Sequence, residues 1–304
     1  MMPYTAEISR TNPSCFLFLI DQSGSMQDVM DPTNLRAMDS PMVVDGRTYT
    51  HTASGKTKAQ GVADAINRLL QNLVIKCAKS EGVRDYYEVG VIGYGGDNTA
   101  YKVGPAFSGA LVGREVVPIG EIADSPARIE ERSKKVDDGA GGLVDQKIKF
   151  PIWFDPVAVG GTPMSQAMTK ARDVLSDWVA RHPASFPPIV INITDGEWTD
   201  SDPTPAAESV KALSTDDGNV LVFNIHISAN QGASIEFPDD ESRLGDQYAR
   251  FLFNLSSPLP SYMQSIARQE GLQVSELSRG FAFNADMVGL IRFIDIGTRP
   301  SNLR

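Results

Sequence analysis

The stretch FLFLIDQSGSM, residues 16–26, runs five apolar residues into an aspartate that small hydroxyl residues and a glycine follow. The continuous apolar run CFLFLI, residues 15–20, predicts a strand that is covered on both faces. Apolar residues then recur at three- and four-residue spacing over residues 56–80, which predicts a long helix. A buried strand followed directly by an amphipathic helix indicates an α/β unit.

The same alternation of strand and helix patterns continues to the end of the chain. Further strands are predicted at residues 86–96, 187–196, 219–228 and 280–285, and further helices at 163–182, 204–214, 243–255, 260–270 and 286–297. The stretch after residue 96, up to about residue 118, is expected to pair with the second strand as a hairpin. This order predicts the α/β class: a doubly wound, mostly parallel sheet with helices on both faces and one antiparallel edge strand.

The expected domain organisation is a tail of residues 1–13 followed by one domain over residues 14–300. Three stretches lack apolar periodicity and are interpreted as insertions, at about residues 27–55, 119–147 and 230–246. An apolar content of 41% in 304 residues is enough for a sizeable core. The two cysteines, Cys15 and Cys77, are too few for a disulfide framework and are expected in that core.

Composition also bears on location and partners. No stretch reaches the roughly 18 apolar residues that a membrane span needs, and the start MMPYTAEISRTNPS lacks a secretory signal pattern, so we expect a cytoplasmic protein without membrane contact. The net charge is −10 and Lys and Arg are not clustered, which argues against nucleic-acid binding. Residues 195–217 contain seven Asp or Glu and one Lys, and residues 236–246 contain five Asp or Glu and one Arg. These are either solvated loops or an acidic end that attracts cations or a basic partner.

Oxygen-bearing side chains follow two of the predicted strands. Asp21 ends the first strand in the sequence D-Q-S-G-S, Asp195 ends the strand at 187–196, and Thr162 lies in GGTPM before a predicted helix. Ligands of open α/β sheets bind beyond the carboxyl ends of the strands, so these side chains can converge. Hydroxyl and carboxylate oxygens without sulfur or histidine suit Mg²⁺, with Mn²⁺ or Ca²⁺ as alternatives. The candidate metal ligands are Asp21, Ser23, Ser25, Thr162 and Asp195. Taken singly, the serines could cap a turn and Thr162 could cap a helix.

This set resembles the metal-ion-dependent adhesion site of the von Willebrand factor A (vWA) family, which is written D-x-S-x-S, then a distant Thr, then a distant Asp. The resemblance covers roughly residues 14–297 and is closest to stand-alone cytoplasmic bacterial members; the 27–55 insertion is longer than the family usually carries. It implies a Rossmann-like fold in which Ser23 and Ser25 bind the metal directly, Thr162 binds directly in the ligand-ready state, and both aspartates act mostly through water. Neutral hydroxyls leave the dication's charge uncompensated, so the open position favours a partner's carboxylate.

The resemblance therefore implies a protein-interaction module and no enzyme: an adapter or regulatory protein that binds a partner's Asp or Glu through Mg²⁺. A kinase, a phosphatase or an ATPase of the same gene cluster is the kind of partner that such bacterial members suggest. Gln22, Glu197 and Trp198 flank the metal motifs and are candidate partner contacts, although Trp198 could equally pack locally. His226 alternates with Asn224 and Ser228 along a strand and is expected to be a satisfied, partly buried histidine.

Two alternatives stay open. A Mg²⁺-dependent phosphatase or phosphotransferase of the haloacid-dehalogenase type also places an aspartate after its first strand. Such enzymes use D-x-D, whereas this chain has Ser23 two residues after Asp21, and the sequence assigns no lysine to a transferred phosphoryl group. The other alternative is a domain of the same fold that holds no metal, in which case a chelator would leave the melting temperature unchanged.

Overall fold

A computed structural model describes residues 4–29, 35–44, 47–53, 56–96, 100–137, 143–227, 234–285 and 287–298. At its centre lies β1 (Ser14–Asp21), all eight residues of which are buried. It pairs in parallel with β6 (Tyr87–Gly96) on one side and with β11 (Ile189–Thr194) on the other. A strand with neighbours at both edges and helices over both faces is apolar throughout, which confirms the strand predicted from CFLFLI.

The central sheet has the order β15 (Ile235–Glu236), β16 (Phe281–Phe283), β14 (Leu221–His226), β11, β1, β6, β7 (Tyr101–Pro105), and β8 (Val117–Pro118) also pairs with β6. The pairings from β16 to β6 are parallel, whereas β7 and β8 at one edge and β15 at the other are antiparallel. The prediction of one antiparallel edge strand is therefore wrong. Strands β8 and β15 have two residues each, too few for any periodicity to be visible.

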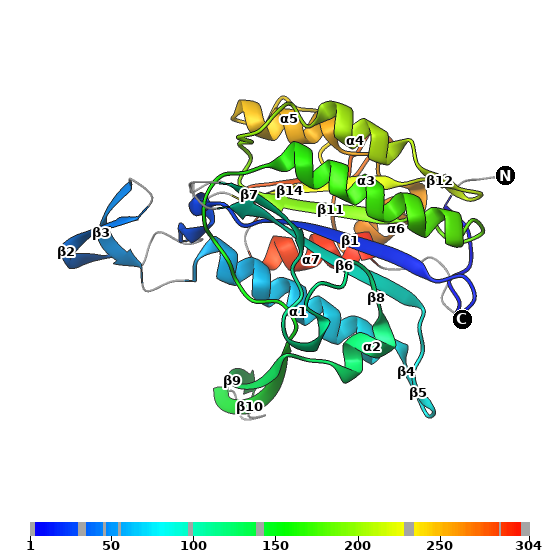
Figure 1. The fold of residues 1–304 in the computed structure, drawn as a ribbon, viewed down its shortest axis with the longest axis horizontal. Coiled ribbons are helices and arrows are strands. Elements are labelled where there is room, and N and C mark those ends of the chain that lie inside the picture. The colour runs from blue at the N-terminus through cyan, green and yellow to red at the C-terminus, as the bar shows by residue number, and fades with distance from the viewer. Residues whose placement is uncertain are drawn as a thin grey trace.

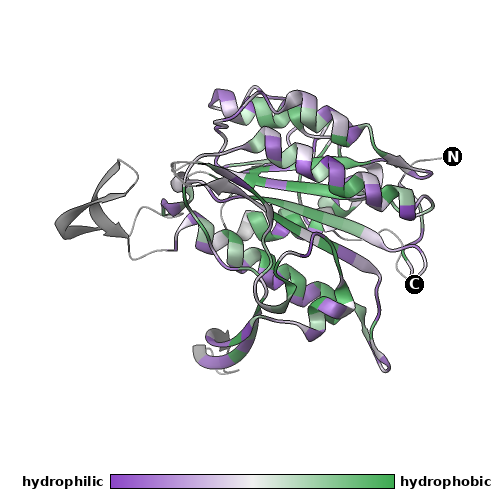
Figure 2. Ribbon diagram, viewed as in Figure 1, coloured by the Kyte–Doolittle hydropathy of each residue, from purple (hydrophilic) through white to green (hydrophobic). Residues whose placement is uncertain are grey.

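Helices cover both faces of this sheet (Figure 1). One face carries α1 (Lys58–Cys77), α2 (Ile119–Asp124), α6 (Ser261–Gln269) and α7 (Met287–Thr298), and the other carries α3 (Met164–Arg181), α4 (Thr204–Lys211) and α5 (Gln247–Leu255). The alternating side chains of β1 divide between the two layers: Phe16 and Phe18 pack with the α1 layer, and Leu17 and Leu19 with the α3 layer. Apolar residues follow the strands and the inner sides of the helices (Figure 2).

This is a mixed α/β architecture with a mostly parallel central sheet, compatible with the doubly wound arrangement that the sequence predicts. The predicted strands and helices are present within a few residues of their expected bounds. Both cysteines are buried in the two apolar layers, as expected. The remaining short elements are η1 (Gly24–Gln27), β4 (Ala78–Lys79), β5 (Gly82–Val83), η3 (Gly109–Leu111), β12 (Ser214–Thr215) and β13 (Gly218–Asn219).

The predicted insertions contain regular structure. Residues 119–147 were expected to be irregular, but they form α2 and most of a long antiparallel hairpin of β9 (Arg128–Asp137) and β10 (Leu143–Ile152). The β9 sequence RIEERSKKVD carries no apolar period, which is why sequence periodicity misses that strand, whereas Ile148, Phe150 and Ile152 of β10 recur at every second position. A second hairpin, β2 (Leu35–Val44) and β3 (Arg47–Ala53), occupies the 27–55 insertion. Of the 230–246 insertion, residues 230–233 lie outside the described residues.

The predicted tail is attached to the body at least in part. The backbone N–H groups of Thr5 and Ala6 donate to the Asp217 carboxylate, each at 2.9 Å, and Ile8 is buried. Of the helices in the described residues, none combines the length and the apolar character that crossing a membrane would need.

Candidate metal centre

The candidate ligands lie where the strand order reverses. From β1 the chain passes to β6 on one side, and β11 then returns on the other side of β1. Ile20 of β1 is in register with Ile193 of β11, so Asp21 and Thr194 follow at the same edge, with Asp195 directly after. The carboxyl ends of strands at such a switch point border the crevice in which open α/β sheets bind ligands.

Hydrogen bonds join the three motif segments at this edge. Gly24 N donates to Gly160 O at 2.8 Å, which ties the D-Q-S-G-S loop to the loop before α3. Thr162 N donates to Thr199 Oγ1 at 2.8 Å, and Thr199 N donates to Thr162 O at 3.0 Å. The loop after β11 is thereby tied to Thr162. The structure thus brings the D-Q-S-G-S loop together with two segments that lie more than a hundred residues later in the sequence.

Asp21 is buried, with 1% of its surface exposed. Its Oδ1 accepts a hydrogen bond from Ser23 N at 2.8 Å, and its Oδ2 accepts one from Thr194 Oγ1 at 2.7 Å. Burial, and after it the negative charge of Asp195, raise the pKa of Asp21 to about 7, although the bonds from Ser23 and Thr194 act in the opposite direction. The site therefore carries a negative charge that is costly to bury, and a bound cation would offset it.

The hydroxyls of Ser23 and Ser25 are 3.0 Å apart at the mouth of the loop. Ser23 is buried and precedes η1, yet its side chain makes no capping bond there within the described residues. Thr162 is also buried, and two N–H groups in the first turn of α3, those of Ser165 and Gln166, donate to the Asp200 carboxylate instead. The structure therefore gives neither Ser23 nor Thr162 the capping role that the sequence left open.

These residues fit a hard divalent cation by ligand type. Adjacent hydroxyl oxygens beside a buried carboxylate are ligands that Mg²⁺, Mn²⁺ and Ca²⁺ accept. Among the described residues, no three or more His, Cys, Asp or Glu side chains cluster so as to hold a metal ion. The five candidate ligands are not such a cluster, because only Asp21 and Asp195 are of these residue types and the other three are hydroxyl residues. Both oxygens of Asp21 already accept protein hydrogen bonds, which suits contact with a cation through water.

A buried lysine, which the sequence analysis did not assign to the site, lies beside Asp195. Lys58 is only 4% exposed, and its Nζ is 3.2 Å from Asp195 Oδ2, 3.5 Å from Asp28 Oδ2 and 3.5 Å from the carbonyl oxygen of Ser25. The capping box of Thr57 and Gln60 fixes Lys58 as the first residue of α1, but its carboxylate partner lies 137 residues away.

The three candidate partner contacts differ in exposure. Glu197 is exposed, whereas Trp198 is half-buried, with its ring centroid 4.3 Å from that of Phe251. The side chain of Gln22 lies against β6, where a Cβ added to Gly93 would approach Oε1 to 2.2 Å. Trp198 thus packs on α5, which favours the local role that the sequence left open, and Glu197 is the candidate most available to a partner.

Several acidic residues of the two acidic stretches are committed to hydrogen bonds. Asp200 caps α3, Asp202 Oδ1 accepts from Thr204 N at 2.9 Å at the start of α4, and Asp217 holds the N-terminal segment. His226 is buried and stacks on Phe283 with ring centroids 5.2 Å apart. Within the described residues its Nδ1 has no hydrogen-bond partner, so the expected satisfied histidine is only half right. Burial lowers the pKa of His226 below its usual value, while Asp246 and Asp195 oppose that shift.

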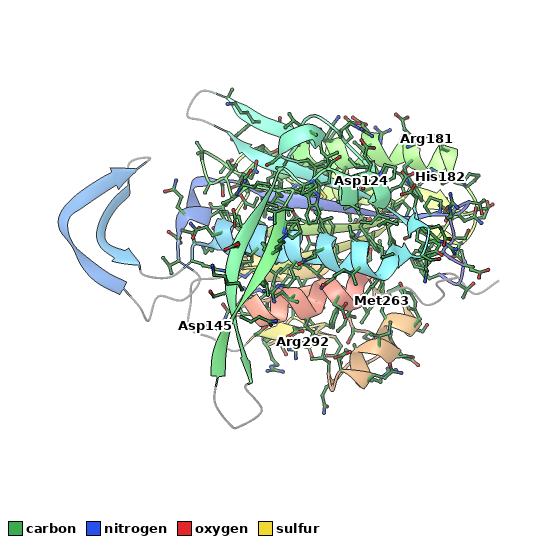
Figure 3. The ribbon with its side chains drawn as sticks, turned by 90° about the horizontal axis from the view of Figure 1, so that it is seen from below. Asp124, Asp145, Arg181, His182, Met263 and Arg292 are labelled. Carbon is green, nitrogen blue, oxygen red and sulfur yellow. The ribbon has the colours of Figure 1, made fainter. Side chains whose placement is uncertain are left out.

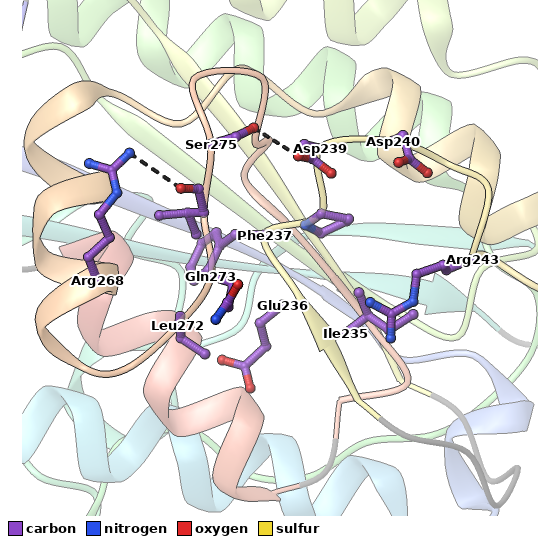
Figure 4. A pocket seen from close by; sticks show the side chains of 12 residues that line it. Ile235, Glu236, Phe237, Asp239, Asp240, Arg243, Arg268, Leu272, Gln273 and Ser275 are labelled. Carbon is purple, nitrogen blue, oxygen red and sulfur yellow. Dashed lines mark hydrogen bonds between the residues drawn. The ribbon is translucent and has the colours of Figure 1, made fainter.

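A separate pocket of about 530 Å³ lies between the β15 segment and the loop after α6 (Figure 4). Ser275 Oγ donates to Asp239 Oδ2 at 2.9 Å, and Arg268 donates to Val274 O at 3.3 Å. None of the five candidate metal ligands lines this pocket, so it is distinct from the metal centre.

Comparison with known proteins adds little. No protein-family model matches the chain, and no curated protein matches it. Among solved structures, the chain is similar to proximal thread matrix protein 1 from the mussel byssus, with a TM-score of 0.40 and 17% sequence identity. The match covers 84% of this chain and 43% of that one, and at this level of similarity it supports no conclusion about function.

Proposed function

We propose that this chain is a vWA-type domain with a doubly wound, Rossmann-like sheet that acts as a metal-dependent protein-interaction module. Its Asp21, Ser23, Ser25, Thr162 and Asp195 would hold Mg²⁺, with Mn²⁺ or Ca²⁺ as alternatives, and the ion would receive a partner's Asp or Glu. One observation carries the proposal: three distant segments are hydrogen-bonded together at the switch point, with the hydroxyls of Ser23 and Thr162 not used as helix caps.

Each residue has a role in this proposal. The hydroxyls of Ser23, Ser25 and Thr162 bind the ion, and the two aspartates orient water around it. When bound, the ion supplies a site of positive charge, because neutral hydroxyls compensate little of it. Asp21 is fixed by its bonds from Ser23 N and Thr194 Oγ1, so the carboxylate keeps one orientation whether or not a ligand is present.

The biological setting that we propose is that of a non-enzymatic adapter in the cytoplasm, without nucleic-acid or membrane contact. A kinase, a phosphatase or an ATPase is the proposed class of partner, and this rests on the sequence resemblance alone. The exposed Glu197 would border the partner's acidic residue, so a partner that also carries Lys or Arg nearby is favoured.

Direct metal binding is the first test. The protein is stripped with a chelator and titrated calorimetrically with Mg²⁺ and Mn²⁺. We expect one ion per chain at the site, and at least about tenfold weaker binding for Ser25→Ala. Ser133→Ala, on the exposed face of β9, is the matched control and should bind as the wild type does. Equal affinity of Ser25→Ala and the control would refute the metal site.

Partner binding is tested separately, with wild type and Ser25→Ala as bait in lysate of the source cell, each in Mg²⁺ and in excess chelator. A protein retained only by the wild type in Mg²⁺ supports the proposal and identifies the partner. The same proteins on all four baits, or none on any, contradicts it.

One observation favours a second candidate, the haloacid-dehalogenase-type phosphatase or phosphotransferase. Lys58 places a cation beside Asp195, where such chemistry would need one. Ser23 still occupies the position of the acid/base aspartate of D-x-D. Turnover of a generic phosphate ester in Mg²⁺ decides between them: turnover that Asp21→Asn abolishes would replace our proposal with this one.

A further inference from the structure

The ammonium group of Lys58 is surrounded by oxygens that a metal ion could also use. Asp195 Oδ2, Asp28 Oδ2 and the Ser25 carbonyl oxygen lie within 3.2–3.5 Å of Nζ, and we name these three oxygens the lysine cradle. Two carboxylates and a carbonyl form a set of hard oxygen ligands of the kind that Ca²⁺, Mg²⁺ and Mn²⁺ take in proteins. The cradle shares Asp195 with the proposed metal site but uses the backbone of Ser25 rather than its hydroxyl.

A lysine is an unfavourable choice at this position for two reasons. Burial of an ammonium group is costly unless it is paired, and Lys58 is 4% exposed. Lys58 is also the first residue of α1, where the positive end of the helix dipole disfavours a cation, and the first turn of α1 contains no acidic residue. Asp28 and Asp195 offset both costs, so these two carboxylates are what hold the Lys58 ammonium at this position.

The backbone holds Lys58 in place from the other side. Lys58 N donates to Asp28 O at 2.8 Å, and Val29 forms an antiparallel bridge with Thr57. The start of α1 is thereby fixed against the segment that follows Ser25. The side chain of Lys58 extends from this junction to Asp195 on the loop after β11. One side chain therefore links the two loops of the proposed metal site.

We propose that Lys58 is a tethered cation that fills the lysine cradle and keeps a second divalent ion out of it. The charges are consistent with this role: Lys58 offsets one of the two negative charges of Asp28 and Asp195, and its removal leaves both for a divalent ion. Only the identity of the first ion's site rests on the proposed function. The cradle itself is defined by the contacts of Lys58 Nζ with Asp195, Asp28 and Ser25, and removal of the lysine should open it.

The test counts divalent ions. Wild type and Lys58→Ala are stripped with a chelator and titrated with Mn²⁺, and bound ions per chain are determined by calorimetry and by electron paramagnetic resonance of free Mn²⁺. Lys58→Ala should bind one ion more than the wild type. Asp28→Asn in the Lys58→Ala background should remove the added ion, whereas Ser25→Ala in that background should leave it, because the cradle uses only the Ser25 carbonyl.

Lys56→Ala is the matched control. The side chain of Lys56 is 61% exposed and pairs with Asp64, away from the cradle, so this variant should keep the wild-type number of ions. Thermal unfolding gives an independent measure. In chelator, Lys58→Ala should unfold at a lower temperature than Lys56→Ala, and Mn²⁺ should raise its midpoint by more than it raises that of the wild type, because two ions then bind the folded state.

The outcomes separate this inference from the proposed function. An unchanged number of ions in Lys58→Ala overturns the tethered cation and leaves the proposed metal site intact. Loss of all ion binding in Lys58→Ala also overturns the tethered cation, since Lys58 would then only position Asp195. No ion in the wild type but one in Lys58→Ala, removed by Asp28→Asn, supports the cradle and refutes the proposed function. If Lys58→Ala does not fold, Lys58→Met keeps the aliphatic stem without the charge and takes its place.

Discussion

Four polar side chains form a hydrogen-bonded chain beneath the candidate metal centre, although no sequence motif singles them out. Tyr94 OH donates to Asn192 Oδ1 at 2.7 Å, Asn192 Nδ2 to Asn224 Oδ1 at 2.9 Å, and Asn224 Nδ2 to Ser256 Oγ at 2.9 Å. All four residues are fully buried. The chain crosses from β6 through β11 and β14 to the end of α5, so it specifies the alignment of these elements, and each member depends on the others for its partners.

Asn192→Ala tests how much this hydrogen-bonded network contributes to the free energy of unfolding. It leaves Tyr94 OH without its acceptor and Asn224 Oδ1 without its donor, and each buried unsatisfied group costs about 1–3 kcal/mol. We expect the free energy of unfolding to fall by about 2–4 kcal/mol, measured by denaturant titration. Asn219→Ala is the control, because Asn219 is exposed and its side chain donates only to Lys211 O; a similar loss in both variants would contradict the network.

At the scale of elements, α3 begins without a capping residue of its own. Pro163 precedes it without a side-chain capping bond among the described residues, and Asp200, from the loop after β11, accepts from Ser165 N and Gln166 N. A carboxylate at a helix N-terminus satisfies free N–H groups and interacts favourably with the helix dipole. The cap therefore also fixes the loop that carries Asp195 against the segment that carries Thr162.

Asp200→Ala should lower the free energy of unfolding by about 1–2 kcal/mol, the usual cost of a lost cap. It should also weaken Mn²⁺ binding, since Thr162 and Asp195 lose a shared support. Asp173→Ala, exposed in the middle of α3, removes the same charge without a cap and should change neither quantity. An effect on stability without any effect on Mn²⁺ affinity would show that the cap does not support the site.

The β9–β10 hairpin is anchored on α1 by charge, and Figure 3 shows it lying across that helix with Asp145 labelled on β10. Arg132 Nη1 donates to Asp64 Oδ1 at 2.6 Å, Lys56 pairs with the other oxygen of Asp64, and the Arg132 guanidinium lies 3.9 Å from the Phe150 ring centroid. Burial raises the pKa of Asp64, but the hydrogen bonds from Lys56 and Arg132 outweigh it, so the pKa lies below its usual value.

This depressed pKa predicts a pH dependence of stability. Because the unfolded value is about 3.9, the Asp64 carboxylate stabilises the fold above about pH 4, and this contribution is lost as the pH falls through the folded pKa. Asp64→Asn should therefore be less stable than the wild type near neutral pH, with the difference shrinking below about pH 4. Unfolding midpoints measured against pH check this. Asp124→Asn on the exposed face of α2 is the control, and a pH-independent difference for Asp64→Asn would contradict the prediction.

At the scale of the whole molecule, one sheet separates two apolar layers, and the loops at the carboxyl ends of its strands carry the candidate site. The segment from residue 30 to 55 leaves and returns at one point, since Val29 bridges to Thr57 and Lys58 N donates to Asp28 O. The stem of this insertion is thus closed beside the D-Q-S-G-S loop. We therefore expect this insertion to fold independently of the core and to be available to a partner.

Replacement of residues 30–55 by an Asn-Gly linker tests that independence. We expect the unfolding temperature to stay within about 4 °C of the wild type, because the two apolar layers are untouched. Mn²⁺ affinity should also be retained, while a partner captured by the full chain should be lost or weakened. The chain with wild-type residues 30–55 in scrambled order is the control for loop length. Loss of folding in the linker variant would show that the insertion is part of the core.

The sequence by itself determined the succession of the main strands and helices along the chain and the five oxygen-bearing residues of the candidate site. Periodicity reports how each residue is buried along its own element, so β1, α1, α3 and β11 could be read directly. Asp21 and Asp195 were recognisable because each follows an apolar strand.

Only the tertiary structure decided which distant groups meet. Periodicity does not report partners, so Lys58 beside Asp195, Asp200 at the start of α3 and the buried Asn192–Asn224 pair were all missed. Strand β15 was missed because two residues show no period, and β9 because its charged sequence has no apolar alternation, whereas β7 and β8 pair antiparallel with β6 in the stretch where a hairpin was expected. These features rest on hydrogen bonds and charges between segments far apart in the chain, and such contacts exist only once the sheet and its two apolar layers have assembled.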